Sequence, residues 1–575
     1  MFGWLRKIRS ETAGGLTSPV SQTAIQVQAE KAEALFLAAR YSAAAVAFQK
    51  VLAKDSANLL ARTRLMRVHL EQGDVPAAKR EADIALTLYP SEIGIMLQSA
   101  YIAKCAGDHT ACLALLRRTQ AEHPNFEALD LQIADECATL GQGSEAIAAL
   151  DRAIALDPRE LNRRSLRLFL LNFFGGMSRR ALFVEHRKWG SMVDKGFAAS
   201  RKKLRVDRQR ERALRIGIVS GDLRLHSVAL FIEGYLREHD RERYPIFCFD
   251  VSPHREDAVT ERLRKHVDGW HSVATLDDDA LADEIREQQI DVLIDLSGHT
   301  KHHRLLMFAR RPAPVQVTWF GYMNTTGLTS INYRLTDERH APLGESQAFY
   351  TEKLFYLPSL ACFTPDARSP AVAPSPFTKN GHVTFISANQ WAKVTEPVRQ
   401  LWAEILCDDS RPHLKIIAAG ASSQEFRESV VNWFVAQGVH ADQVELLPTM
   451  DLPTFLAYFG HADVALDPFP YGGGTTTLHT VWMGVPIIAM QGDTELGRAT
   501  PGMLVGFGLP DFVANTREEY RDIAIALARN PSRLVDIRAN LRQRMADSSA
   551  LDAQGLAQNV ENVFRTMWHT YCASR

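Results

Sequence analysis

"ADVALDPFPYGGGTTTLHTVWMGVPIIAMQGD", residues 462–493, holds the pattern that decides the fold. A short apolar run ends near Pro470, three glycines and three threonines follow, and a helical stretch comes next. Val485-Pro486 ends that stretch, because a residue before proline disfavours helical geometry, and a second apolar run begins. A strand, a loop, a helix and a strand in this order predict a parallel βαβ unit.

The Gly/Thr loop, Tyr471 to Thr477, is compatible with two structures. Glycine lets the backbone approach a ligand because no Cβ intervenes, and free N–H groups at a helix start attract anions. Thr475 and Thr476 add hydroxyl donors, although no Walker Gly-Lys-Ser/Thr occurs here. The pattern predicts either a phosphate cradle that includes Gly474 or a glycine-rich loop with threonine capping a helix.

Strands and helices alternate on both sides of this unit. "LRIGIVSGD", "YPIFCFDVS", "IDVLIDLSG" and "PVQVTWFGY" predict the strands of one lobe, and "HVTFISANQ", "LKIIAAGAS" and "QVELLP" predict further strands of another. We predict two doubly wound, Rossmann-like lobes, residues 213–370 and 381–575, the second with a final helix, joined by a Pro-rich connector at 371–380. Ligands bind beyond the carboxyl ends of such strands, so we expect the site in a cleft between the lobes.

The first third of the chain is repetitive. Small residues recur every 34 positions, at Ala44, Ala78, Cys112 and Ala146. This period, with Gly-Asp or Gly-Gln before a helix and Pro after it, is typical of tetratricopeptide repeats. We predict an α-helical superhelix of four repeats over residues 25–160, with a concave surface for peptides or proteins. A basic, flexible N-terminus at 1–24 and a basic helical linker at 161–212 would flank it.

The bulk composition excludes several classes of protein. Lys plus Arg (66) nearly equals Asp plus Glu (67), so the net charge of -1 gives no electrostatic case for a nucleic-acid partner. Seven cysteines are scattered without a Cys-x-x-Cys pair, as in reduced cytosolic proteins. No run has the length of a signal-peptide core or a membrane span. We expect a soluble, cytoplasmic protein with no membrane partner.

A lysine follows the first strand of the second lobe, in "SANQWAKVTEP". Lys393 could neutralise a phosphate leaving group, and Asn389 and Gln390 could donate hydrogen bonds to ligand oxygens. By itself, a lysine in a loop is more typical of a solvated charge.

Histidines follow two strands of the first lobe. In "GDLRLHSVALF", His226 could take a proton from a hydroxyl or donate to a phosphate oxygen, although a lone histidine is more often structural. His299 and Gly321-Tyr322 lie in glycine-rich loops after later strands. The histidines around His299 lack the carboxylate or cysteine of a familiar ligand set, so we predict no metal. The acidic run at 277–279 is predicted to cap a helix.

These segments together resemble a known family. The chain is similar to bacterial tetratricopeptide-repeat O-linked N-acetylglucosamine transferases, the SPINDLY-like group of glycosyltransferase family 41. The resemblance spans nearly the whole chain: the repeats, "SGDLRLHSVALF", "DLSGHTKHHRLLMFARRPAPVQVTWFGYMNTTG", "NQWAK", "ALDPFPYGGGTTT", "VWMGVP" and "GDTELGRA". It implies a GT-B catalytic region that transfers GlcNAc from UDP-GlcNAc to Ser or Thr of a protein, with inversion and without a metal or other cofactor. The acceptor would bind through the repeat groove and the interlobe cleft.

The resemblance also implies roles for residues in the matching motifs. Lys393 would stabilise the leaving diphosphate, Gln390 would contact it, and Thr475 and Thr476 would bind it at the helix start. His226 would lie beside the donor and the acceptor hydroxyl, and whether it is the base stays open. The remaining candidate binding residues belong to the same motifs: Asn389, Gly474, Thr477, His479, Gly321, Tyr322 and His299.

The chain departs from the family at the nucleoside and sugar ends. His479 stands where relatives usually have an acid that holds the ribose, and Phe455 where a histidine is common. The loop "GYMNTTG" differs too, although Gly321 and Tyr322 would still shape the sugar pocket. These departures leave open a different donor, such as GDP-fucose, or a repeat scaffold with an inactive transferase region. The acceptor and the oligomeric state are open as well.

Overall fold

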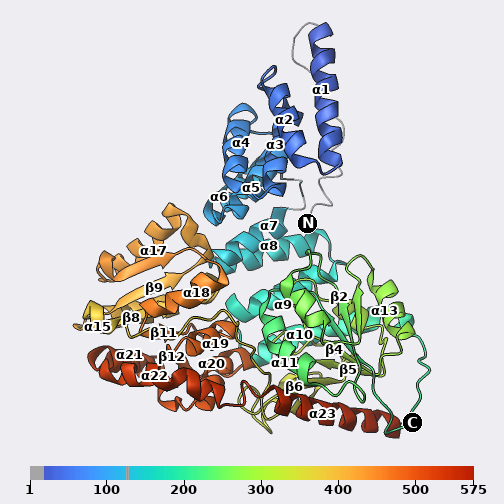
Figure 1. The fold of residues 1–575 in the computed structure, drawn as a ribbon, viewed down its shortest axis with the longest axis vertical. Helices are drawn as coiled ribbons and strands as arrows, with labels where there is room; N and C mark the ends of the chain where they lie inside the picture. The colour runs from blue at the N-terminus through green and yellow to red at the C-terminus, as the bar shows by residue number, and fades with distance from the viewer. Residues whose placement is uncertain (1–18, 125, 127–128, 175, 575) are drawn as a thin grey trace. The chain divides into compact units, whose positions relative to one another are not determined.

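The computed structural model describes residues 19–124, 126, 129–174 and 176–574 (Figure 1). The chain forms two compact units, Met1–Leu129 and Asp130–Arg575. Helix α1 begins at Pro19, inside the segment predicted as a flexible N-terminus, and residues 1–18 lie outside the described part. Among the described residues, no helix combines the length and the apolar composition that membrane crossing needs.

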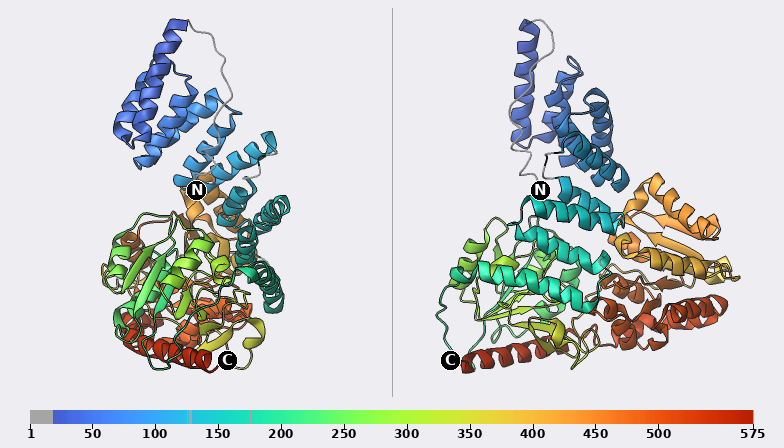
Figure 2. Two further views of the ribbon diagram at one scale, coloured as in Figure 1. Left: turned by 90° about the vertical axis from the view of Figure 1, so that its right-hand side faces the viewer. Right: turned by 180° about the vertical axis from the view of Figure 1, so that it is seen from behind.

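The first unit consists of helical hairpins (Figure 2). Its helices are α1 (Pro19–Leu37), α2 (Tyr41–Leu52), α3 (Leu59–Glu71), α4 (Val75–Leu88), α5 (Ile93–Cys105) and α6 (His109–Glu122). Ala44, Ala78 and Cys112 lie buried on the second helix of successive hairpins. Asp74 caps its helix by accepting a hydrogen bond from the Ala77 N–H at 2.9 Å, and Asp108 does the same 34 positions later. The predicted repeat is therefore present in packing and capping.

The hairpins continue into the second unit as α7 (Leu129–Thr139), α8 (Gly143–Leu156), α9 (Leu161–Phe174) and α10 (Arg179–Gly196). The segment predicted as a basic helical linker, 161–212, is helical over α9 and α10, but these two helices pack against the first lobe and so are more than a linker. Leu168 and Trp189 share a core with Phe249 of the first lobe. A Cβ on Gly190 would lie 1.8 Å from the Gly327 carbonyl oxygen, so α10 contacts lobe backbone directly. Arginines alternate with apolar residues in these helices, and for that reason the sequence resembled a charged linker.

The first lobe is a seven-stranded parallel sheet of order β3-β2-β1-β4-β5-β6-β7. The strands are β1 (Ile216–Ser220), β2 (Ile246–Asp250), β3 (Gly269–Ser272), β4 (Val292–Asp295), β5 (Val315–Thr318), β6 (Tyr333–Thr336) and β7 (Lys353–Tyr356). The helices are α11 (Ser227–Glu238), α12 (Ala258–Arg264), α13 (Asp278–Glu287) and α14 (Leu305–Phe308). Ile216 pairs with Ile246 of β2 on one side and Val292 of β4 on the other, so the strand order reverses at β1.

The second lobe repeats this plan in a six-stranded parallel sheet of order β10-β9-β8-β11-β12-β13. Its strands are β8 (Thr384–Ser387), β9 (His413–Ile417), β10 (Val444–Leu447), β11 (Val464–Leu466), β12 (Ile487–Met490) and β13 (Val513–Ala514). Its helices, after α15 (Phe377–Asn380) in the connector, are α16 (Glu396–Leu406), α17 (Gln424–Ala436), α18 (Leu452–Tyr458), α19 (Thr475–Trp482), α20 (Glu495–Gly506), α21 (Arg517–Arg529) and α22 (Ser532–Ala546). The predicted fold, helical repeats followed by two Rossmann-like lobes, is confirmed.

The final helix, α23 (Ala553–Ala573), returns to the first lobe (Figure 1). Phe564 and Trp568 are buried in one core with Tyr235 and Trp319 of that lobe. We predicted this helix as part of the second lobe because it follows that lobe in sequence. Its apolar face instead completes the first lobe, and the chain therefore crosses between the lobes twice.

One buried ion pair links the lobes. Arg334 on β6 and Glu495 at the start of α20 lie 2.6 Å apart between Nη2 and Oε2, and both side chains are almost fully buried. Thr336 and Tyr350 also donate hydrogen bonds to the Glu495 carboxylate, at 2.8 and 3.1 Å. Surrounding donors compensate the desolvation of this carboxylate, so the contact fixes one side of the interlobe cleft.

Breaking this pair should destabilise the second unit strongly. Glu495→Gln leaves the Arg334 charge buried without a counter-charge, and we expect the free energy of unfolding in urea to fall by about 3–5 kcal/mol. Lys202→Met is the control, because it removes an exposed ion pair with Asp283 and should change stability far less. Equal effects of the two substitutions would contradict the role assigned to Glu495.

Candidate functional site

A cavity of about 350 Å³ lies at the carboxyl ends of both sheets. Residues of both lobes and of α9 line it. The predicted site residues on its wall are His226, Gly321, Tyr322, Asn389, Gln390, Lys393, Gly474, Thr475 and Thr476. Side chains that follow β1, β5, β8 and β11 thus meet in one place, as expected where the order of a doubly wound sheet reverses.

Asp467 shapes the Gly/Thr loop from beneath. Its buried carboxylate directly follows β11 and accepts hydrogen bonds from the Gly473 N–H at 2.8 Å and from the Asn389 amide at 3.2 Å. A Cβ on Gly472 would lie 2.4 Å from this carboxylate, so a glycine is needed there. Burial raises the pKa of Asp467 to about 6, against the opposing effect of Thr500 and the other donors.

The loop leads into the N-terminus of α19. Gly474 precedes the helix, and among the described residues no side chain caps its first turn. Thr475 and Thr476 line the cavity at this end. The first N–H groups of a helix have no partner within the helix, and with the helix dipole they favour a bound anion.

Thr477 does not join this wall. It is 1% exposed, and its hydroxyl bonds the Thr500 hydroxyl at 3.0 Å. Thr500 in turn donates to the Gly473 carbonyl at 3.2 Å. The prediction that Thr477 contacts the ligand is therefore not supported by its geometry, because its side chain turns to the core side of the helix and braces the loop.

Lys393 points at the Gly/Thr loop. It ends a short helical turn, η3 (Trp391–Lys393), that follows β8. Its ammonium donates to the Gly472 carbonyl at 2.7 Å and lies 4.1 Å from the centroid of the Tyr471 ring. Burial lowers the pKa of Lys393 to about 8, and Asp467 opposes this shift. At neutral pH the site therefore holds a cation beside a helix N-terminus.

His226 begins α11, and its side chain is 39% exposed. The ring Nδ1 accepts a hydrogen bond from the Val228 N–H at 3.3 Å and lies 3.6 Å from Asp222. Burial lowers the pKa of His226, and this lowering favours the neutral ring. The negative charge of Asp222 has the opposite effect, but a smaller one. A neutral ring that accepts through Nδ1 carries its proton on Nε2, so Nε2 is a hydrogen-bond donor.

Tyr322 is held from the helical side of the cavity. Its hydroxyl accepts from the Asn172 amide on α9 and bonds His186 Nε2 on α10, each at 2.7 Å. His186 Nδ1 bonds the Leu182 carbonyl, so Nε2 is the acceptor for the Tyr322 hydroxyl. Gly321 allows this arrangement, since a Cβ there would lie 1.8 Å from the backbone oxygen of Leu296.

Two more predicted site residues, His299 and His479, do not line the cavity. His299 is 1% exposed, and its nitrogens bond the Ser165 hydroxyl at 2.7 Å and the Thr326 carbonyl at 3.0 Å. It anchors α9 to the lobe, which corrects its assignment as a ligand residue. His479 is packed between Phe363 and Phe455, and burial lowers its pKa to about 4. Its ring contributes packing behind the wall.

Several residues that line the cavity or support its loops escaped the sequence analysis. Asp467 and Tyr471 lay within the quoted motif, and an aspartate that ends a strand just before a glycine-rich loop was the available signal. Phe169 and Phe173 on α9 line the cavity as well. They carried no usable signal, because α9 was predicted to be a linker.

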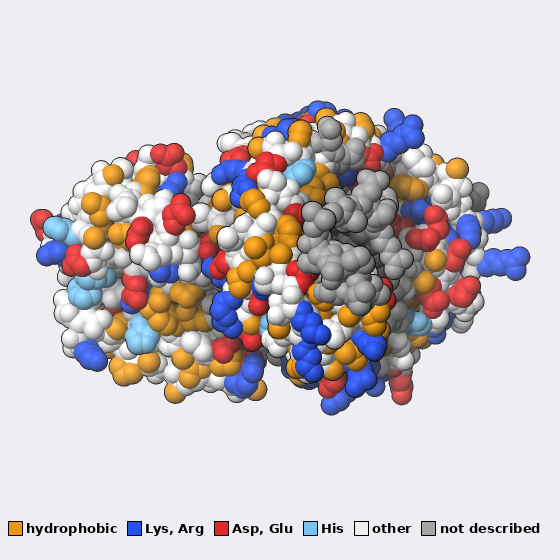
Figure 3. All heavy atoms as spheres, turned by 90° about the horizontal axis from the view of Figure 1, so that it is seen from above, with side chains coloured by type: hydrophobic (Ala, Val, Ile, Leu, Met, Phe, Trp, Pro, Cys, Tyr) orange, Lys and Arg blue, Asp and Glu red, His pale blue; other side chains and the backbone are white. Residues whose placement is uncertain are grey.

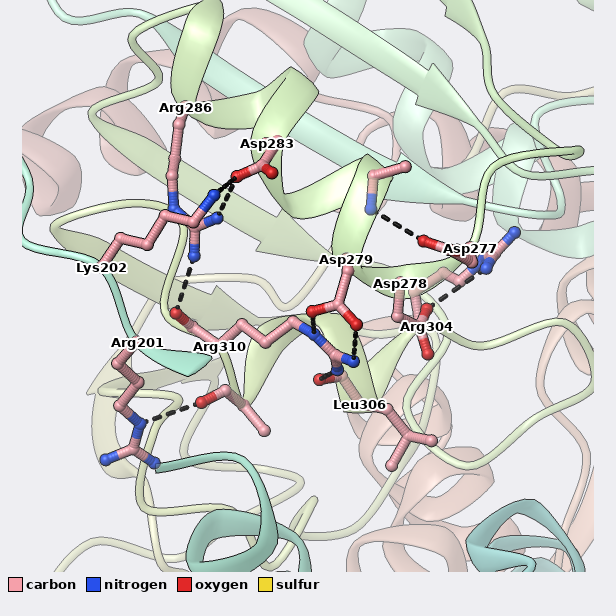
Figure 4. A network of polar contacts seen from close by, with 12 residues as sticks. Arg201, Lys202, Asp277, Asp278, Asp279, Asp283, Arg286, Arg304, Leu306 and Arg310 are labelled. Atoms are coloured by element: carbon pink, nitrogen blue, oxygen red, sulfur yellow. Dashed lines mark hydrogen bonds and ion pairs between the residues drawn. The ribbon is translucent and has the colours of Figure 1, made fainter. Parts of the chain in front are cut away.

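The acidic run at 277–279 caps a helix, as predicted (Figure 4). Asp277 accepts a hydrogen bond from the Ala280 N–H at 2.8 Å, and Asp279 pairs with Arg310 through two contacts of 2.5 and 2.8 Å. Asp278 lies 3.2 Å from Arg304. In the part of the chain that the structure describes, no group of three or more His, Cys, Asp or Glu residues could hold a metal ion.

Charges of both signs cover the molecular surface in a mixture. Figure 3 shows acidic and basic side chains interspersed with apolar ones over the face it draws, in keeping with a net charge of -1.

The chain belongs to glycosyl transferase family 41, because residues 191–369 and 378–560 match the model of that family. A solved structure of a Thermobaculum terrenum O-GlcNAc transferase mutant superimposes with a TM-score of 0.80 and 33% identity, over 90% of this chain and 98% of that one. The predicted membership of the family is thus confirmed.

Curated relatives are named for transfer of N-acetylglucosamine to peptides. A Petunia hybrida protein named probable UDP-N-acetylglucosamine--peptide N-acetylglucosaminyltransferase SPINDLY is 36% identical over 73% of this chain and 45% of its own. The Arabidopsis thaliana protein SEC, named for the same activity, is 28% identical over 63% of this chain and 38% of its own. The chain spans about half the length, or less, of these curated relatives.

Asp467→Asn should weaken diphosphate binding. Both hydrogen bonds go to one oxygen, Oδ1, so an asparagine that kept them would place its N–H₂ where Oδ2 lies. The substitution also removes the negative charge that makes these two hydrogen bonds strong, so the loop should be held less firmly. We expect the Kd for UDP, measured by calorimetry, to rise by about tenfold or more.

Asp463→Asn is the matched control. Asp463 precedes the same strand, is 1% exposed, and accepts from the Thr384 N–H at 2.9 Å away from the cavity. Its substitution should lower stability but leave the UDP affinity of the folded protein unchanged. A tight UDP complex in Asp467→Asn would contradict the role of this carboxylate.

Proposed function

We propose that this protein is an inverting protein O-glycosyltransferase that transfers GlcNAc from UDP-GlcNAc to Ser or Thr of a protein acceptor, without help from a metal ion. The proposal is supported by membership of family 41 and by the names of similar proteins. The observation that carries it is the Lys393 ammonium, which bonds the Gly/Thr loop on the wall of a cavity that both lobes line.

The arrangement matches the main electrostatic demand of this reaction. A serine hydroxyl is a weak nucleophile, so much of the barrier must fall by stabilising the departing diphosphate. As the acceptor oxygen forms its bond to the sugar C1, the bond from C1 to the diphosphate oxygen breaks and negative charge grows there. The hydroxyl proton passes to the departing diphosphate or to water. Lys393 and the free N–H groups of α19 lie where they would bind this charge.

His226 acts in this proposal as a hydrogen-bond donor. With Nδ1 occupied by the Val228 N–H, Nε2 carries the proton and can donate to a sugar or phosphate oxygen. The same tautomer cannot take a proton from the acceptor hydroxyl through Nε2. The geometry therefore supports a binding and polarising role over that of a base.

The acceptor and the setting complete the proposal. We assign acceptor binding to the groove of the helical repeats and to the open side of the cleft, because stacked repeats present concave surfaces that hold extended peptides. Cys248, Cys362 and Cys407 are free thiols, which supports a reducing, cytoplasmic location.

Transfer can be tested directly. Intact-mass analysis of candidate acceptor proteins after incubation with several sugar nucleotides should show the addition of N-acetylhexosamine from UDP-GlcNAc. A panel of nucleotides in a thermal-shift assay should show stabilisation by UDP. Stabilisation by GDP alone would favour the alternative donor that the replacement by His479 leaves open, and no nucleotide binding would favour an inactive scaffold.

Lys393→Ala should reduce kcat at least about a hundredfold, on the scale of losing one donor that stabilises transition-state charge. Lys379→Ala is the control, because Lys379 is exposed on α15, away from the cavity, and its loss should leave kcat unchanged. Rates of transfer to a fixed peptide at saturating donor measure both. Near-normal turnover by Lys393→Ala would refute the assigned role.

The dependence of kcat/KM on pH should reveal the ionisation of Lys393. Because its pKa is lowered to about 8, Lys393 loses its charge as pH rises through that value. We expect kcat/KM for the donor, which reports ionisation of the free enzyme, to fall on the alkaline side from about pH 8. In Lys393→Arg the residual activity should lose this alkaline limb, since a guanidinium stays protonated. An identical limb in the arginine variant would assign it to another group.

A further inference from the structure

Helices that precede the family match contact the donor side of the cavity. The matched region begins at residue 191, whereas α7, α8 and α9 end at Phe174 or earlier. Phe169 and Phe173 nevertheless line the cavity. Helices α7 to α9 of the second unit therefore contribute to the cavity wall. Two separate series of contacts connect them to Lys393.

The first route begins at the turn between α7 and α8. Gly141 in this turn has φ of +75°, and a Cβ there would lie 3.2 Å from Cδ1 and Nε1 of Trp391. Trp391 begins the η3 turn that Lys393 ends, and it is 5% exposed. Its indole also packs edge-on against Phe426, with ring centroids 5.5 Å apart. The α7–α8 turn therefore packs against one side of the Trp391 indole, and Phe426 packs against another.

The second route runs through aromatic rings. Gly143 at the start of α8 is in close contact with Phe174, and the neighbouring Phe173 lies 4.3 Å, centroid to centroid, from Tyr471. The Tyr471 ring faces the Lys393 ammonium at 4.1 Å. A cation held over an aromatic face is attracted to the ring, the more so where water is excluded.

Lys393 needs such support because little else fixes it. Its side chain is long, and a long flexible ammonium loses several rotamers when it is held in one place. It makes one direct hydrogen bond, to the Gly472 carbonyl. The Tyr471 ring and the position of the η3 turn supply the remaining constraint, and both are packed against α7–α9.

We propose that the α7–α8 turn and Phe173 are positioning elements of the donor site, which hold Trp391 and Tyr471 and through them fix the Lys393 ammonium at the Gly/Thr loop. This inference rests on the proposed function for the meaning of Lys393. It follows that the last predicted repeat and the diphosphate end of the cavity are packed as one body. A displacement of the α7–α8 hairpin would then be felt at Lys393.

Gly141→Ala tests the first route, and the repeats supply a matched control. Gly73 occupies the corresponding turn between α3 and α4, two repeats earlier, has φ of +76°, and has no atom within 4 Å of a built Cβ. Gly73→Ala therefore carries the same left-handed strain without meeting an indole. We expect Gly141→Ala to lower kcat about tenfold relative to Gly73→Ala, with a similar thermal midpoint, because small misplacements of a catalytic group are costly.

Two further measurements separate positioning from general damage. In Gly141→Ala the alkaline limb of kcat/KM should move to higher pH, since a loosened ammonium is better hydrated and holds its proton longer. In a Trp391→Leu background, the added methyl group no longer meets the indole, so Gly141→Ala should have little further effect. Phe173→Leu should also move the alkaline limb of kcat/KM to higher pH, because Phe173 packs against Tyr471 and the Tyr471 ring faces Lys393.

The outcomes decide the inference independently of the proposed function. UDP affinity by calorimetry needs no transfer, and it should fall several-fold in Gly141→Ala and stay unchanged in Gly73→Ala. A wild-type protein that binds UDP but transfers no sugar would refute the proposed function, and the affinity comparison would still decide the inference. If Gly141→Ala and Gly73→Ala have the same kcat, the same pH for the alkaline limb of kcat/KM and the same UDP affinity, the inference is overturned.

Discussion

The site depends on one buried carboxylate, that of Asp467. It lies where β11 leaves the sheet and accepts hydrogen bonds from the Gly/Thr loop and from Asn389, which follows β8. Because β8 and β11 are the neighbours at which the strand order reverses, a single side chain joins the two loops that a diphosphate would contact. A buried carboxylate is tolerated only when donors surround it. The loops and Asp467 therefore stabilise each other, and the Gly472 carbonyl that receives Lys393 is fixed as a result.

The first lobe uses the same device. Asp295 ends β4, the fourth strand of its lobe, and accepts hydrogen bonds from the Gly298 N–H and from the Thr318 hydroxyl. Burial raises the pKa of Asp295, as it does for Asp467. Two facing lobes thus carry loops fixed by buried aspartates, and the Arg334–Glu495 pair holds the lobes together. Charge developing in such a preorganised cavity meets donors that need little reorientation.

The sequence sufficed to predict the fold and the meeting of Lys393 with the Gly/Thr loop. It failed where the direction of a side chain decides whether the residue reaches the cavity. Apolar periodicity reports burial, so the repeats and both lobes were predictable. Lys393 and the Gly/Thr loop were predictable because glycine, hydroxyl and cation before a helix suit an anion. His299 and Thr477 sit beside the same motifs but turn to the core, and spacing within a loop does not specify that turn. Phe173 was missed because its helix, rich in arginine, has the composition of a solvated linker.

In the proposed reaction, the contacts to the diphosphate would be common to all nucleoside diphosphate sugars, so other residues of the cavity wall would set the identity of the donor. Phe231 and Phe363 make much of that wall apolar, and apolar contacts discriminate weakly between similar ligands. Polar groups discriminate more strongly, because a mismatch leaves them unpaired. His340 is one such group: its Nδ1 bonds the Asp337 carboxylate at 2.7 Å, which leaves Nε2 as the ring nitrogen that can meet a ligand. A ligand that offers this nitrogen a hydrogen-bond partner is matched, and one that leaves it unpaired is not, whatever Lys393 does for the diphosphate.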